Sequence, residues 1–409
     1  MKDIRLNGWQ RASLSAFGVV LLLSVSARLF SAPGLTGSST VSTALGFAVP
    51  VILAGLGGLV AERAGVFNIG LEGMMIMGTW GAGYLGWHFG PWGALLGGLI
   101  GGFLGGALLA LATVTFAVDQ TVAGVAINIL SIGLVRYLSG IFFDGKGSEG
   151  DLGTIADSPS VRNFGSKFSI PFIGDWLQTI EDKRWFLLSD LAGTVRGFTI
   201  EVAWSSVLLL LLIPAVWYLV WRTPFGLRLR SSGEKPAAAE SLGVNVMLTR
   251  WMALLISGSL AGLGGAWLVL DSLKYQQGMT ASRGFLGMAA MIFGNWMPGL
   301  LSIGALLFSF SQSVGFQLGL ESRAVIGAVG LSFLLAAGSN VVKKRYKPAL
   351  GLGIVAAFVL WFASANEVIN DALIKALPYL LTMIVLTVAS KRQRPPAASG
   401  QPYIKGQAG

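Results

Sequence analysis

The residues of this sequence whose types and spacing could bind a solute are polar residues inside long apolar segments. Asn68 and Glu72 lie one helical turn apart within 61–78, and Asn128 lies two turns into another apolar segment. Polar groups at membrane depth are costly, so they indicate either a solute path or hydrogen bonds between helices. Amide and indole groups could bind and stack a small polar solute. The candidate substrate-path residues are Asn68, Glu72, Trp80, Asn128, Asn295 and Trp296.

Groups for covalent or metal chemistry are scarce. The sequence has no cysteine, and its single histidine, His88, has no second histidine or carboxylate at metal-ligand spacing. The stretch from Gly140 to Gly147 resembles a phosphate-binding loop but lacks the Ser or Thr that binds magnesium there. HExxH and GxSxG motifs are also missing. We therefore expect no catalytic residue, no metal site and no cofactor bound by this chain.

The elements that must position the polar residues are apolar helices. Hydrophobic residues make up 54% of the 409 residues and charged residues only 12%, which excludes a soluble enzyme, a disordered chain and a nucleic-acid-binding domain. A helix needs about 20 mainly apolar residues to cross a bilayer. The sequence therefore predicts an all-α polytopic membrane protein with about 10–12 transmembrane helices. The predicted spans are 15–31, 44–61, 71–90, 92–118, 121–143, 202–221, 251–270, 284–297, 299–320, 324–342, 348–365 and 372–390.

Two of these segments differ from plain spans. The segment 284–297 is short and rich in Gly and Pro, which predicts a half-helix or a re-entrant segment. Glycines recur every four residues in the segment 92–118, so they share a helical face that another backbone can approach closely. One row is Gly93, Gly97, Gly101 and Gly105, and the second row is Gly98, Gly102 and Gly106. We expect this helix to be central in the bundle.

The distribution of basic residues predicts the orientation, because cytoplasmic loops are rich in Lys and Arg. The stretch 144–201 has six basic and nine acidic residues, whereas the short loop 343–347 has four basic residues. Both termini are therefore expected in the cytoplasm. The long loop 144–201 is expected either to cap the helices or to dock a partner. The predicted organisation is a cytoplasmic N-terminus 1–14, a first transmembrane half 15–143, an external loop 144–201, a transmembrane helix 202–221, a cytoplasmic loop 222–250, a second transmembrane half 251–390 and a disordered cytoplasmic tail 391–409.

The cytoplasmic loop contains a pattern that predicts a short projecting helix. Pro236 stands early in an Ala-rich stretch, and Gly243 stands where the helix would end. The stretch resembles the coupling segment of ABC importer permeases, which seats in a groove of the ATP-binding subunit. We call residues 233–243 the candidate coupling segment. The residues that match are Gly233, Glu234, Pro236, Ala238, Ala239, Glu240 and Gly243.

The resemblance extends to three further stretches. ERAGVFNIGLEGMM, QTVAGVAINILSIGL and SRGFLGMAAMIFGNWMPG are similar to the simple-sugar and nucleoside branch of these permeases, which is ribose-permease-like. The NIGLEG version is associated with nucleoside importers, and the GGIDLSVG-like stretch of ribose-type members is missing. The matches cover 44–143 and 222–320 well, whereas 144–201 has no counterpart.

The resemblance implies an ABC importer permease fold in a bacterial plasma membrane. It implies a permease subunit that forms the translocation path for nucleosides and hydrolyses nothing itself. The expected partners are an ATP-binding subunit that holds ATP and magnesium, a second permease subunit that is a paralogue, and an external substrate-binding lipoprotein. The lipid bilayer is a further partner, and no nucleic acid is expected.

Three alternatives stay open at this point. A simple-sugar ABC permease would share the same motifs. An ion-coupled secondary transporter would need titratable groups within the membrane, and Glu72 is the only carboxylate well within a predicted span. A membrane scaffold without transport would not need polar residues in broken helices. An ATPase bound in stoichiometric amount would distinguish the importer from the other two classes.

Overall fold

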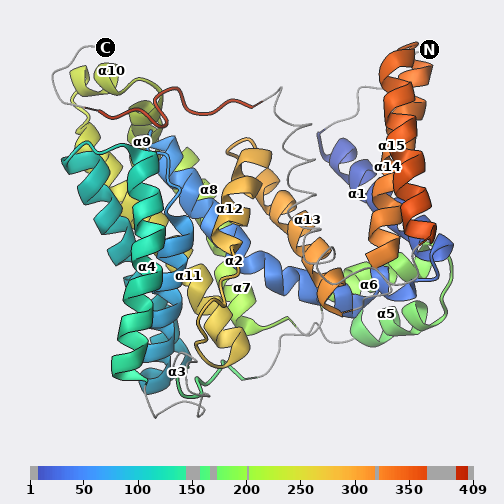
Figure 1. Cartoon of the computed structure of the whole chain (residues 1–409), viewed down its shortest axis with the longest axis horizontal. Coiled ribbons are helices and arrows are strands. Elements are labelled where there is room, and N and C mark those ends of the chain that lie inside the picture. Colours follow the sequence, from blue (N-terminus) through green and yellow to red (C-terminus); the bar gives the residue numbers. More distant parts are fainter. Residues whose placement is uncertain are drawn as a thin grey trace. The chain divides into compact units, whose positions relative to one another are not determined.

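The computed structural model describes residues 8–143, 157–165, 173–199, 202–317, 322–365 and 393–403. Every regular element of this part of the chain is helical (Figure 1). The helices are α1 Gly8–Leu29, η1 Pro33–Thr36, α2 Ser38–Arg63, α3 Leu71–Ala110, η2 Leu111–Thr115, α4 Gln120–Phe142, α5 Ile173–Asp182, α6 Leu188–Thr199, α7 Trp204–Leu210, α8 Leu212–Arg222, α9 Pro224–Glu234, α10 Pro236–Ser241, α11 Val246–Ser272, α12 Arg283–Phe293, α13 Pro298–Gln317, α14 Ser322–Val342 and α15 Tyr346–Ala365.

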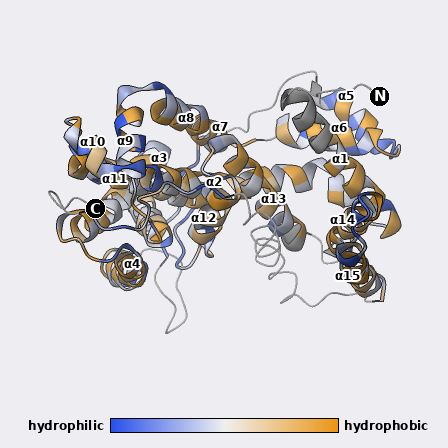
Figure 2. Ribbon diagram, turned by 90° about the horizontal axis from the view of Figure 1, so that it is seen from above, coloured by the Kyte–Doolittle hydropathy of each residue, from blue (hydrophilic) through white to orange (hydrophobic). Residues whose placement is uncertain are grey.

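The lengths and compositions of these helices confirm the predicted fold class. Seven helices of the described part are long and apolar enough to cross a membrane, and three further apolar helices are shorter. Figure 2 shows the contrast between hydrophobic colouring in α4 and hydrophilic residues in α9. The predicted span 372–390 lies outside the described residues. The chain is an all-α polytopic membrane protein.

The chain folds into two compact units. The larger unit contains residues 48–166, 203–308 and 381–409, and the smaller unit contains residues 1–47, 167–202 and 309–380. All the candidate substrate-path residues and the whole candidate coupling segment belong to the larger unit.

Helix α3 contains the two predicted spans 71–90 and 92–118 as a hairpin. Gly90 has φ 70° and ψ −158°, a conformation that breaks the helix directly before Pro91. The two halves then pack side by side in antiparallel directions. A Cβ atom at Gly81 would overlap the carbonyl oxygen of Gly97, and a Cβ atom at Gly105 would lie 3.0 Å from Met74. The first glycine row therefore closes this hairpin.

The second glycine row packs on α11, which lies beside α3 in Figure 1. A Cβ atom at Gly102 would overlap the carbonyl oxygen of Gly258, and Gly98 and Gly106 approach other residues of α11 as closely. The predicted close packing is confirmed for this face. The opposite face is open, since Leu104 is 51% exposed. The expectation of a central helix is therefore wrong for that face.

Helix α12 is the predicted half-helix. Its 11 residues would span only about 16 Å, roughly half the hydrocarbon thickness of a bilayer. Left-handed residues stand at both ends: Ala281 and Ser282 before the helix, with φ 43° and 63°, and Asn295 and Trp296 after it, with φ 50° and 55°. Such conformations are unfavourable for residues other than glycine and persist only where the surroundings hold them.

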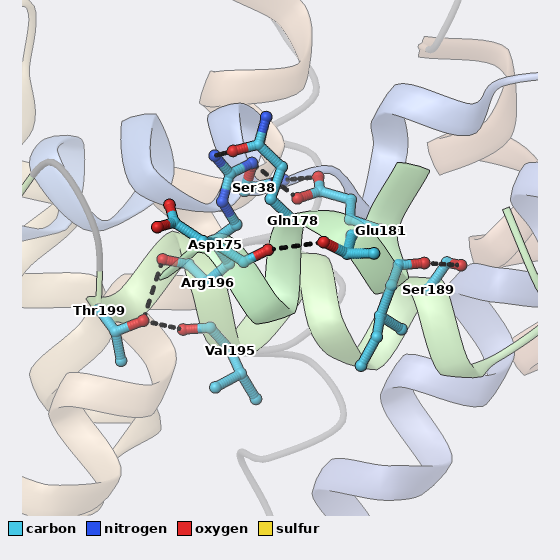
Figure 3. A network of polar contacts seen from close by, with 10 residues as sticks. Ser38, Asp175, Gln178, Glu181, Ser189, Val195, Arg196 and Thr199 are labelled. Atoms are coloured by element: carbon cyan, nitrogen blue, oxygen red, sulfur yellow. Dashed lines mark hydrogen bonds and ion pairs between the residues drawn. The ribbon is translucent and has the colours of Figure 1, made fainter. Parts of the chain in front are cut away.

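In the smaller unit, α5 and α6 form a hairpin that packs on the start of α2. Arg196 donates to Glu181 at 3.0 Å, to the Ser38 hydroxyl at 3.1 Å and to Gln178 at 2.9 Å (Figure 3). Glu181 also accepts a hydrogen bond from the Ser38 amide at 2.8 Å. This part of the stretch 144–201 has the packing of a cap on helix ends. Its external location stays a prediction.

The end of the chain differs from the sequence-based expectation. The stretch 391–409 lacks apolar periodicity and is expected to be disordered, yet residues 393–403 form backbone and side-chain hydrogen bonds with other elements of the larger unit. The Ala398 amide donates to the Gly233 carbonyl oxygen at 2.9 Å, and a turn is closed from the Gln401 amide to the Ala398 carbonyl oxygen at 3.2 Å. The prediction of disorder is wrong for this segment because its backbone finds partners on other elements, which periodicity does not reveal.

Candidate functional site

Glu72 caps the half-helix α12. One carboxylate oxygen of Glu72 accepts a hydrogen bond from the Ser282 amide at 3.1 Å, and the other accepts from the Gly284 amide at 2.7 Å. The first amides of a helix lack partners within the helix, and negative charge there is favourable. A Cβ atom at Gly284 would lie 2.6 Å from the Glu72 Cα atom, so glycine is needed for this approach. Both oxygens of Glu72 therefore hold a helix end in place.

Asn128 fixes the start of α3 to α4. Its side-chain oxygen accepts a hydrogen bond from the Gly73 amide at 2.7 Å, and its side-chain amide donates to the Ile69 carbonyl oxygen at 3.1 Å. Both ends of the side chain are bound to backbone groups, one in the break before α3 and one in the first turn of α3. Asn128 thus joins α4 to α3. Hydrogen bonding between helices was the alternative to a role in a solute path, and these contacts favour it.

Asn68 differs from these two residues because half of its side chain is unpaired. It lies in the break between α2 and α3 and is only 1% exposed. Its amide donates to the Ser257 hydroxyl at 2.9 Å, whereas its side-chain oxygen has no hydrogen-bond partner among the described residues. A buried acceptor without a partner costs about 1–3 kcal/mol. Asn68 is therefore the polar residue of this group with an acceptor left for a water or a solute.

Trp80 belongs to an aromatic cluster in the α3 hairpin. Its ring stacks on Tyr84, with 5.5 Å between centroids and 5° between planes, and contacts Phe142 and Phe143. The indole N–H is buried without a partner in the described part of the chain. A cavity of about 260 Å³ with almost entirely apolar walls adjoins it. The lining residues are Met77, Trp80, Gly81, Tyr84, Leu85, Gly97, Ile100, Gly101, Leu104, Leu134, Val135 and Leu138.

Asn295 and Trp296 form the left-handed turn between α12 and α13. The Trp296 indole donates to Glu62 at 2.7 Å, and Arg63 donates to the Trp296 carbonyl oxygen at 3.0 Å. The Asn295 side-chain oxygen accepts from the Arg394 amide at 2.8 Å. The structure therefore uses both residues to attach the turn to the end of α2 and to the chain terminus. It does not bring Trp296 to Trp80 as a second stacking surface.

The candidate coupling segment has the predicted helix. The Thr223 hydroxyl accepts from the Gly226 amide at 3.1 Å and caps α9, and α10 begins at Pro236 and ends before Gly243, which has φ 84°. The Gly243 amide donates to the Glu240 carbonyl oxygen at 2.9 Å. A left-handed glycine after the last turn is a common helix end, so this part of the prediction is confirmed.

The start of the candidate coupling segment is seated on the break between α2 and α3. A Cβ atom at Gly233 would overlap the Arg63 carbonyl oxygen and would lie 3.0 Å from the Gly65 nitrogen. The Ser232 hydroxyl donates to the Ala64 carbonyl oxygen at 3.3 Å. Any residue larger than glycine at position 233 would separate the segment from this break.

The outer face of α10 agrees only in part with the sequence pattern: Ala238 and Gly243 are exposed, whereas Ala239 is not. Ala239 is buried within the chain at 3% exposure, so it cannot enter a groove of a partner. The exposed residues of α10 are Ala237, Ala238 and Ser241, and Leu242, which follows the helix, is 85% exposed. The sequence reasoning missed Leu242. The sequence feature that could have indicated it is a large apolar residue between Ser241 and Gly243, at the end of a short helix in an otherwise polar loop.

Comparison with known proteins adds the family. Residues 40–337 match the family described as branched-chain amino acid transport system / permease component. The chain belongs to this family. Groups of three or more potential metal-binding side chains do not occur in the described part of the chain.

Relatives within this permease family cover nearly the whole chain. The guanosine ABC transporter permease protein NupQ of Bacillus subtilis is 32% identical over 90% of this chain and 98% of NupQ. The nucleoside ABC transporter permease protein NupC of Lactococcus lactis is 30% identical over 90% of this chain and 97% of NupC. TsgC13 of Haloferax volcanii, a protein named for glucose transport, is 29% identical over 87% of this chain and 94% of TsgC13. No solved structure matches the chain.

The family assignment fixes the class of activity. The chain is a permease subunit of an ABC importer, a multi-pass membrane protein that is not itself an enzyme. ATP hydrolysis takes place in a separate ATP-binding subunit, and an importer of this type also works with a substrate-binding protein.

Proposed function

We propose that this permease carries nucleosides inward. The observation that supports this substrate is the similarity to NupQ and NupC, which extends over nearly the full length of both chains. The aromatic surfaces of Trp80 and Tyr84 are suited to stacking on a nucleobase, and the unpaired Asn68 oxygen could accept a hydrogen bond from a solute. A sugar is the second candidate, favoured by the similarity to TsgC13.

We propose that residues 233–243 couple transport to ATP. The segment is exposed along Ala237, Ala238 and Leu242, and its start rests on the break that leads to Asn68 and Glu72. Movement of the segment would move this break, and with it the end of α12 that Glu72 holds. The energy for such a shift comes from the higher affinity of ATP for one state of the motor.

The contacts of Glu72 argue against an ion-coupled transporter. Both of its oxygens accept hydrogen bonds from backbone amides. These two bonds commit both oxygens of Glu72 to the start of α12, where negative charge is favourable. The hydrogen bonds of Glu72 thus support a structural role for this carboxylate.

The assembly follows from the proposed activity. We expect a second permease subunit that is a paralogue, an ATP-binding subunit at the face of α10, and a substrate-binding lipoprotein on the opposite side. Only 22% of the apolar stretch of α4 is buried within this chain. Most of the helix surface is therefore left for contact with lipid or with the second permease. We place the complex in a bacterial plasma membrane with both termini in the cytoplasm.

Uptake by the reconstituted complex tests the substrate. Proteoliposomes that contain both permeases, the ATP-binding subunit and ATP, with substrate-binding protein outside, should accumulate radiolabelled guanosine. Excess unlabelled nucleoside should compete, whereas glucose and leucine should not. Uptake of labelled glucose without uptake of any nucleoside would establish the sugar candidate instead. A complex without ATP-binding subunit is the control for passive leak.

A further inference from the structure

The segment 393–403, which we call the C-terminal strap, lies against the candidate coupling segment. The Ala398 amide donates to the Gly233 carbonyl oxygen at 2.9 Å, and the Ala397 amide donates to the Glu234 carboxylate at 3.4 Å. These bonds occupy the backbone and side chain at the junction of α9 and α10. The strap is therefore bound where the segment bends.

The far end of the strap holds α10 itself. The Tyr403 hydroxyl donates to the Glu240 carboxylate, and the Tyr403 ring lies 5.4 Å from the Arg250 guanidinium carbon. Partial burial and the hydrogen bond to Glu240 raise the pKa of Tyr403 to about 12, so the hydroxyl keeps its proton at neutral pH. Arg250 also donates to the Gln401 carbonyl oxygen at 3.2 Å. Tyr403 thus joins α10 to the start of α11.

The strap also reaches the transmembrane helices. The Arg394 amide donates to Asn295 at 2.8 Å, and the Ser399 hydroxyl donates to Glu62 at 3.5 Å. Glu62 in turn accepts from the indole of Trp296. The strap therefore connects α10 with the end of α2 and with the left-handed turn after α12.

These contacts leave the outer face of α10 free. Tyr403 and the strap backbone use Glu240, Glu234 and the Gly233 carbonyl oxygen, whereas Leu242 is 85% exposed. A six-residue helix does not hold its own position, because isolated helices of this length are unstable. The position of α10 therefore depends on what its inner side binds, and the strap supplies the last of those contacts.

We propose that the C-terminal strap holds α10 in the position that docks the ATP-binding subunit, with Tyr403 as the positioning residue. This inference rests on the proposed coupling role of residues 233–243. Without the bond from Tyr403 to Glu240, α10 samples other positions, and the ATP-binding subunit binds only the fraction in the docked position. The apparent affinity falls by that fraction.

The test is the affinity of the full-length permease complex in detergent for the purified ATP-binding subunit. Tyr403→Ala and a stop after residue 392 should each weaken binding about tenfold, the effect of roughly one charge-assisted hydrogen bond. Tyr403→Phe keeps the ring over Arg250 and should lose less. A stop after residue 403 is the matched control and should bind as wild type. Thermal unfolding of Tyr403→Ala should be unchanged, which a merely structural residue would not allow.

Two outcomes would overturn the inference. Unchanged affinity in both Tyr403 variants and in the stop after residue 392 would show that the strap has no part in docking. Tighter binding after truncation would show that the strap covers the docking face instead of holding it. Leu242→Asp separates these outcomes from failure of the proposed function: lost binding in Leu242→Asp with normal strap variants refutes the strap alone. Normal binding and uptake in Leu242→Asp refutes the coupling assignment itself.

Discussion

At the scale of single residues, the polar groups of the helix breaks divide into two kinds. Glu72 and Asn128 have both ends of their side chains bound to backbone groups. Asn68 and Trp80 each keep one buried polar atom without a partner in the described residues. The first kind holds helices together, and the second kind carries the unpaired polar atoms that we propose for hydrogen bonds to a solute.

Glu72→Ala should lower the free energy of unfolding by about 3 kcal/mol, because two amides at the start of α12 lose their acceptor. Glu72→Gln should cost roughly half as much, since the amide keeps the shape and one acceptor oxygen. Thermal unfolding of the purified variants measures the difference, and uptake is measured in parallel. Equal stability of wild type, Gln and Ala variants would contradict the capping role.

Asn68 permits a complementary experiment on substrate. Asn68→Ala removes both the unpaired side-chain oxygen and the amide that donates to Ser257. We expect Asn68→Ala to raise the KM for nucleoside uptake about fivefold or more while the permease still assembles with its ATPase, as for loss of one hydrogen bond to a solute. An unchanged KM in Asn68→Ala would remove Asn68 from the path.

At the scale of elements, close packing of glycine faces joins α3 and α11. A Cβ atom at Gly102 would overlap the Gly258 carbonyl oxygen, whereas a Cβ atom at Gly133 of α4 would meet nothing within 4 Å. Helices that approach this closely cannot separate without losing many contacts on both sides.

Gly102→Ala should therefore destabilise the protein by about 1–3 kcal/mol, the usual range for overpacking. Gly133→Ala is the matched control in another transmembrane helix, and it should be neutral or slightly stabilising because alanine favours helix. The yield and thermal stability of monodisperse protein compare the two. A loss in Gly133→Ala equal to that in Gly102→Ala would argue against the packing account.

The short helix α10 gives a different pair of variants. Leu242→Asp changes only an exposed residue, so stability should be retained while ATP-driven uptake falls at least tenfold, the effect of a charge placed at the centre of a docking face. Ala239→Asp places a carboxylate at a site that is 3% exposed, and should lower the stability itself. Loss of uptake in Ala239→Asp alone, with a stable Leu242→Asp that transports normally, would contradict the proposed face.

At the scale of the whole molecule, the orientation in the membrane is open to a direct test. The sequence has no cysteine, so single-cysteine labelling has no background. Lys235→Cys and Asp182→Cys both replace exposed residues. An impermeant maleimide should label position 182 in intact cells and position 235 only after the membrane is opened. Labelling of position 235 from outside would reverse the predicted topology.

The sequence by itself determined the membrane class, the positions of the long apolar helices, the half-helix and the glycine faces. These are local properties, because the length of an apolar run and the spacing of small residues decide them before any contact forms. Tertiary structure decided the roles of the polar residues. Glu72 meets its amide partners 210 and 212 residues away, Ala239 is buried by its own chain, and the terminal segment is ordered by the elements it binds. Helix phase tells which residues share a face, but only packing decides what that face meets.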